Sequence, residues 1–204
     1  MNKKIILGIL VIGILTIIAS LFIFNHTKSN KLLNSDKLID IDDIDDEEYN
    51  VYSALIRSTY GDNPNTLPVI VEDTTSPPEG GLSGISAKEV QQETVDNFKK
   101  ANQQSYLLKR RFNPSINYIL ISQEELKNIF SRDLVRGWDK FHKKYPNSQG
   151  IITLSRVGFN NQKDQALVYI GDQFSSLSGA GSIILLIKEN NVWKIKQRFM
   201  LWIS

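Results

Sequence analysis

Cysteine is absent from the 204 residues of this chain. Its absence excludes disulfides, thiol nucleophiles, thiolate metal sites and lipid attachment through cysteine. Histidine is scarce as well, and His142 is the only one that lies beyond the first 26 residues. A catalytic histidine needs a carboxylate and a nucleophile, and no G-x-S-x-G elbow is present to provide the nucleophile. We therefore expect His142 to be a surface residue and expect no metal site, no cofactor and no catalytic residues.

The acidic run at 42–48 is the segment that most resembles a metal site. A calcium-binding loop requires acids at alternate positions, a glycine at the sixth position and a closing glutamate, and the glycine is missing here. The same acids precede a helical stripe of apolar residues that starts at Tyr49 and ends at Tyr60, next to Gly61. Acidic side chains in a first turn interact favourably with the helix dipole. The run therefore predicts a helix start.

An apolar segment from Ile5 to Phe24 is the longest hydrophobic run in the chain. Twenty residues in a helix span about 30 Å, which matches the hydrocarbon core of a bilayer. A cleavable signal peptide has a shorter apolar core, so we expect a retained single-pass anchor, with a cleaved signal as the alternative. Lys3 and Lys4 precede the run, but Lys28 and Lys31 follow it, so charge alone leaves the orientation open.

The remaining chain divides by composition into a polar, acidic tether at 25–44 and one domain at 45–204. The net charge of +2 conceals an asymmetry, because Asp36–Glu48 holds eight acids and one base. Lys88–Ser204 holds eighteen Lys and Arg residues against ten acids. A basic domain is typical of proteins with anionic partners. The basic residues do not alternate with aromatic ones in a dense stripe, so we expect no nucleic-acid partner.

Local signals in the first half of the domain predict helices alternating with short strands. S-x-x-E capping boxes predict helix starts at Ser86 and Ser122. A further stripe of apolar residues at helical spacing predicts another helix, which ends at Pro146. β-branched runs predict strands at Leu67–Asp73 and Asn117–Ser122, and a Pro/Gly-rich loop follows the first of them at 74–84.

From Gly150 onward the pattern is β-rich. Four runs with short turns between them predict an antiparallel meander, and their ranges are Gly150–Phe159, Gln165–Asp172, Gly179–Lys188 and Val192–Ile203. Helices followed by a meander indicate an α+β domain in which the helices pack on one face of the sheet. An NTF2-like or cystatin-like shape fits this order of elements.

Several short motifs carry a resemblance to a known group of proteins. They are YNVYSALI at 49–56, GWDKFHKKYP at 137–146, SRVGFN at 155–160, QALVYIG at 165–171, SGAG at 178–181 and LIKENNVWKI at 186–195. The chain resembles, over about three quarters of its length, an uncharacterised family of bacterial exported or membrane-anchored proteins. The closing hairpin with its W-K-I ending is also similar to that of NTF2-like domains. The resemblance implies an extracytoplasmic domain at the cell membrane and brings no assigned activity.

Arg156, within SRVGFN, is the first candidate site residue. A charged side chain among strand residues needs a partner, and a buried Arg–carboxylate pair is bidentate and rigid. Asp133, Asp139 and Asp164 are the candidate carboxylates. Arg156 either fastens the sheet to the helices or grips an anionic ligand on the concave face of the sheet.

Gly179 and Gly181 flank Ala180 at the start of a predicted strand. Such glycines either allow a ligand to approach the backbone or mark a bulge or the crossing of a large ring. Trp138, Trp193 and Trp202 are the rings available for such a crossing.

Together these patterns favour a membrane-anchored extracytoplasmic binding or interaction module, with a protein or an anionic small molecule as its partner. Two alternatives stay open. One is an NTF2-like pocket enzyme, a small-molecule hydrolase or isomerase, and the other is an immunity or inhibitor protein. A pocket enzyme would require a carboxylate or His142 beside Arg156 in a closed cavity.

Overall fold

The structure is a computed structural model that describes residues 44–61, 65, 67–78, 82, 85, 88–113, 115–131 and 133–204. The predicted membrane span and nearly all of the predicted tether lie outside these residues. Within the described part, no helix combines the length and the apolar character needed to cross a bilayer. Ile44, the last residue of the predicted tether, is buried in the domain core.

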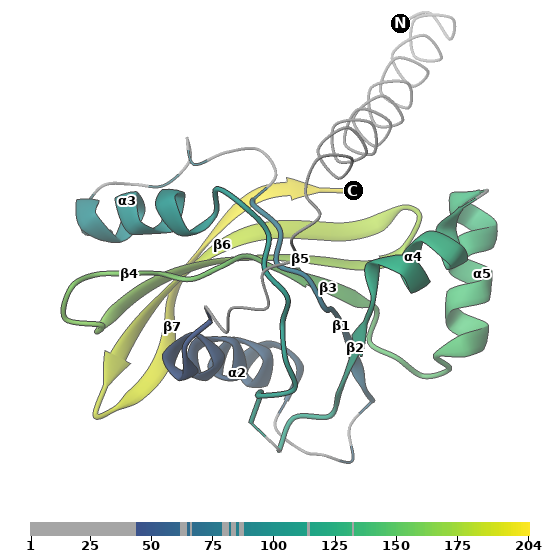
Figure 1. The fold of residues 1–204 in the computed structure, drawn as a ribbon, viewed down its shortest axis with the longest axis horizontal. Coiled ribbons are helices and arrows are strands. Elements are labelled where there is room, and N and C mark those ends of the chain that lie inside the picture. The colour runs from purple at the N-terminus through teal and green to yellow at the C-terminus, as the bar shows by residue number, and fades with distance from the viewer. Residues whose placement is uncertain are drawn as a thin grey trace, which may run out of the picture. The chain divides into compact units, whose positions relative to one another are not determined.

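The described residues form an α+β domain of four helices and a mixed seven-stranded sheet (Figure 1). The helices are α2 (Asp46–Tyr60), α3 (Gln92–Ala101), α4 (Gln123–Phe130) and α5 (Leu134–Lys144). The strands are β1 (Val69–Glu72), β2 (Tyr118–Ile121), β3 (Ile151–Leu154), β4 (Gly158–Phe159), β5 (Gln165–Ser175), β6 (Ser178–Glu189) and β7 (Val192–Ile203).

The predicted antiparallel meander is present as β3-β5-β6-β7. The sheet as a whole is mixed, because β1 pairs in parallel with both β2 and β3 and extends the sheet to the order β2-β1-β3-β5-β6-β7. The short β4 pairs with β5 further along the path of β3. The prediction of a purely antiparallel sheet was therefore wrong at this side of the domain.

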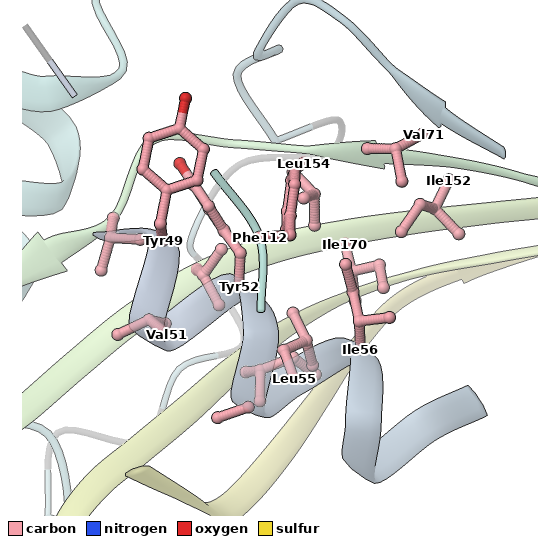
Figure 2. Close-up of a cluster of buried hydrophobic side chains, with 14 of the residues drawn as sticks. Tyr49, Val51, Tyr52, Leu55, Ile56, Val71, Phe112, Ile152, Leu154 and Ile170 are labelled. Atoms are coloured by element: carbon pink, nitrogen blue, oxygen red, sulfur yellow. The ribbon is translucent and has the colours of Figure 1, made fainter. Parts of the chain in front are cut away.

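Helices cover both faces of the sheet, so the prediction of a single covered face was also wrong. On one face α2 packs against alternate residues of β5 and β6, among them Val168, Ile170 and Ile184. Figure 2 shows Tyr52, Leu55 and Ile56 of α2 turned toward Ile152, Leu154 and Ile170. On the other face α3 packs over intervening residues such as Leu167 and Ile183. The α4–α5 pair packs over Ile70, Ile121 and Ile151.

The start of α2 follows the prediction. Asp45 caps the helix by accepting a hydrogen bond from the Glu48 amide at 2.9 Å, and three acids occupy the first turn. Gly61 ends the helix with φ 95°, a conformation that side chains disfavour. The helix α4 also begins as predicted, with the Ser122 hydroxyl accepting from the Glu125 amide at 3.1 Å.

The second helix begins later than predicted: Ser86 itself lies outside the described residues, but residues 88–90 are not helical and α3 begins at Gln92. Its cap comes from a distant strand. The Gln165 side-chain oxygen accepts hydrogen bonds from the Gln91 amide at 2.7 Å and from the Thr94 hydroxyl at 3.1 Å. A cap that is supplied 74 residues away leaves no local signature in the sequence.

A bulge between Ile195 and Gln197 shifts the side-chain phase of β7. Ile195 pairs with Leu186 and packs under α2, whereas Phe199 pairs with Ile183 and packs under α3. An extra residue between paired positions exchanges the faces of a strand. One strand therefore contributes apolar side chains to both cores.

Candidate functional site

Arg156 lies in the short gap between β3 and β4, where the chain crosses the α2 face of the sheet. Its guanidinium forms a bidentate pair with Glu48 of α2, with Nε 2.9 Å from Oε2 and Nη2 2.6 Å from Oε1. Both side chains are nearly buried, at 10% and 6% exposure. The ring of Tyr106 lies 4.1 Å from the guanidinium carbon. The partner is therefore Glu48, which the sequence did not suggest, and not one of the three aspartates considered.

Surrounding groups add hydrogen bonds to this pair and to the backbone beside it. The Val157 amide donates to Glu48 at 3.0 Å, and the Tyr52 hydroxyl donates to the Ser155 carbonyl at 2.8 Å. The Asn102 side chain accepts from the Arg156 amide and donates to the Arg156 carbonyl. The network therefore joins α2, the end of α3 and the β3–β4 gap.

The electrostatics of the pair agree with this packing. Burial lowers the pKa of Arg156, but the hydrogen bonds and charge of Glu48 outweigh it, so that the pKa lies above its ordinary value. Arg156 is thus charged at any physiological pH. The geometry favours the role in which Arg156 fastens the sheet to a helix.

The two candidate glycines lie beneath a tryptophan ring. A Cβ atom on Gly181 would lie 2.0 Å from Nε1 of Trp202, and one on Gly179 would lie 3.3 Å from the same ring. Trp202 Nε1 donates to the Tyr169 hydroxyl at 3.1 Å. Of the three rings considered, Trp202 is the one that crosses these glycines.

His142 is exposed on α5, with its ring 5.5 Å from the ring of Trp138. Within the described ranges, no group of three or more His, Asp or Glu residues is arranged to hold a metal ion.

A polar cluster that the sequence did not suggest lies on the α2 face, at the end of β5. Burial raises the pKa of the Asp172 carboxyl above its ordinary value, although the Ala180 amide, Arg198 and the Tyr60 hydroxyl all act to lower it. The Ala180 amide donates to Asp172 at 3.1 Å. Burial, reinforced by the charge of Asp172, also raises the pKa of Tyr60. The cluster combines a half-buried carboxylate, a phenol and a guanidinium.

Exposed apolar side chains gather at the same end of the sheet. Four of the nine large hydrophobic side chains exposed in the described part lie here, and we call them the hairpin-end patch: Phe174, Leu177, Met200 and Ile203. Leu177 is 84% exposed and Ile203 is 74% exposed. Pairing places Ile203 opposite Ala180, which is itself opposite Asp172. The hairpin-end patch therefore borders the polar cluster. No sequence pattern located the patch, because its position depends on how the strands pair.

The described residues also line two open hollows elsewhere on the surface. One, of about 370 Å³, lies between α4 and α5 and is lined by Ser122, Glu124, Glu125, Asn128, Ile129, Lys140 and Lys144. The other, of about 510 Å³, is lined by Glu47, Gln162, Lys163, Asp164, Lys188, Asn190 and Asn191. In the second hollow Lys163 binds Asp45 and Lys188 binds Glu47, so these lysines already have carboxylate partners.

No family model, curated protein or solved structure matches this chain.

Proposed function

We propose that this protein is a membrane-anchored, extracytoplasmic interaction module that binds a protein partner through the hairpin-end patch. The observation that supports the proposal is the concentration of exposed apolar side chains at one end of the β5–β7 sheet. Contiguous apolar surface bordered by polar groups is typical of protein interaction sites. Asp172 and Arg198 provide polar groups at the border of the patch.

The location in this proposal rests on the apolar run from Ile5 to Phe24 and on the family resemblance. An immunity or inhibitor role is one form of the same function, with a toxin or an enzyme as the partner. The NTF2-like pocket enzyme is the less favoured alternative, because the carboxylate beside Arg156 is Glu48, whose oxygens pair with Arg156 and the Val157 amide inside the core.

Photo-crosslinking from single positions in living cells tests the proposed surface. A photoreactive residue at position 177 or 203 should capture the same protein, and Leu177→Asp should abolish capture from position 203. Position 192 is the matched control, because Val192 is 51% exposed at the opposite end of β7. Equal capture from 192 and 203 would contradict the assignment of this surface.

Mass spectrometry of membrane fractions tests the anchor separately. We expect peptides from the Ile5–Phe24 segment on the mature protein. A mature N-terminus near Asn25 in the soluble fraction would show that the segment is a cleaved signal.

A further inference from the structure

The exposed side of α5 carries a line of basic residues. Arg136, Lys140 and Lys143 follow one another at spacings of four and three, which aligns them on one side of a helix. All three are exposed, whereas Trp138 and Phe141 are buried against the core. The basic line therefore faces away from the domain, opposite the packed side of the helix.

Neighbouring acids neutralise only part of this charge. The helix contains four basic residues and one acid, Asp139. Lys144 forms an ion pair with Glu125 at 2.5 Å, and Arg136 Nε lies 3.9 Å from Asp133. Among the described residues, Lys140 and Lys143 form no ion pair. Lys140 and Lys143 therefore keep their charge on the exposed side, with Asp139 as the one acid of the helix near them.

The surroundings of the line suit a bilayer surface. Val135, at the first turn of α5, is 61% exposed and Leu134 is 45% exposed. Lys140 also lines the hollow between α4 and α5, together with Ser122, Asn128 and the acidic residues Glu124 and Glu125. Hydroxyl, amide and ammonium groups are donors for phosphate oxygens. Basic residues on an exposed helix side are attracted to an anionic lipid surface, and Val135 provides an exposed apolar side chain near them.

We propose that α5 lies on the surface of the bilayer and binds anionic phospholipid headgroups through Arg136, Lys140 and Lys143. The chain between residues 24 and 44 spans up to about 70 Å when extended, so the tether allows this contact. The inference rests on the anchor in the proposed function and is independent of the hairpin-end patch. Each basic residue near an anionic leaflet contributes about 1 kcal/mol, a factor of about five.

Site-specific fluorescence on the full chain tests this contact, since a chain without cysteine accepts one label at an introduced cysteine. An environment-sensitive dye is placed at Val135→Cys, and the protein is reconstituted into phosphatidylcholine vesicles with or without phosphatidylglycerol. We expect a blue-shifted emission, quenched by brominated lipid, only when phosphatidylglycerol is present. Lys140→Glu with Lys143→Glu removes two positive charges and adds two negative ones, so the ratio of docked to free domain should fall by at least about thirtyfold.

Three controls separate this proposal from its rivals. Lys99→Glu with Lys100→Glu makes the same charge change on exposed residues of α3, and should leave the signal unchanged. A dye at Val192→Cys should show no shift. Equal loss in both double variants, or equal emission with and without phosphatidylglycerol, would overturn the proposal. Flotation of the vesicles after an alkaline wash tests the anchor alone. If the chain does not float with the vesicles, the anchor proposal fails. The dye at Val135→Cys then still reports whether α5 contacts added phosphatidylglycerol vesicles.

Discussion

Removing the Arg156 side chain should be among the most damaging single changes in the domain. Arg156→Ala would leave the Glu48 carboxylate buried, with the Val157 amide at 3.0 Å and the more distant Tyr52 hydroxyl at 3.4 Å as donors. Breaking a buried ion pair from one side costs about 3–5 kcal/mol, because the other charge stays unpaired in a region of low polarity. For a domain of this size that loss corresponds to a fall in Tm of roughly 6–20 °C.

Two further variants separate pairing from packing. Arg156→Lys keeps the charge but loses the planar fork that binds both carboxylate oxygens, so its loss of stability should be smaller. Glu48→Met combined with Arg156→Met removes both charges, and replacing a buried pair by apolar residues is often neutral or stabilising. The double variant should therefore be more stable than Arg156→Ala by at least about 2 kcal/mol.

Urea unfolding followed by circular dichroism on the 43–204 fragment measures these differences. We expect this fragment to unfold cooperatively, because the core clusters and the cap of α2 lie within it. A fragment starting at Tyr49 should not, since it lacks Ile44 and Glu48. An Arg156→Ala domain that unfolds at the wild-type midpoint would refute the structural role, and would favour ligand binding at Arg156.

The local elements could be predicted from the sequence because their signals are local. The acids, stripe and glycine of α2 adjoin one another in the chain, and so do the strands and turns of the meander. The parallel pairing of β1 with β3 joins segments about 80 residues apart, and nothing in either strand specifies that partner. The same limit applies to Arg156, whose need for a carboxylate was evident but whose partner is 108 residues away.

The burial of both sheet faces did leave a signal in the sequence. The β5 segment Ala166–Ile170 and the β6 segment Ile183–Ile187 are uninterrupted apolar runs, which is typical of strands covered on both sides. The order of helices followed by a meander predicted one covered face, whereas these two runs indicate that both faces are buried. The polar cluster at Asp172 had no such signal, because strand pairing and the end of α2 bring its members together.

Three further predictions follow from close contacts and shifted pKa values. A Cβ on Gly158 would lie 2.3 Å from the Phe98 backbone in α3. Gly158→Ala should therefore lower the free energy of unfolding, measured by urea titration, by about 3 kcal/mol. A change near zero would show that α3 can move aside. Burial raises the pKa of Glu47, but hydrogen bonds from Lys188, Asn50 and Trp193 outweigh it and the pKa lies below its ordinary value. The stability from this group is present above the unfolded pKa and is lost as the pH falls through the folded one. Glu47→Gln should therefore flatten the decline in Tm below about pH 4.5, and an unchanged decline would contradict this linkage. Asp172 has the opposite sign, because burial raises its pKa in the folded state. The folded domain then binds the proton more tightly than the unfolded chain does, and stability falls as the pH rises through the interval between the two pKa values. Asp172→Asn should accordingly raise Tm at pH 7 and leave Tm unchanged at pH 3. A lower Tm at pH 7 would instead show that Arg198 and the Ala180 amide stabilise the charged carboxylate more than burial destabilises it.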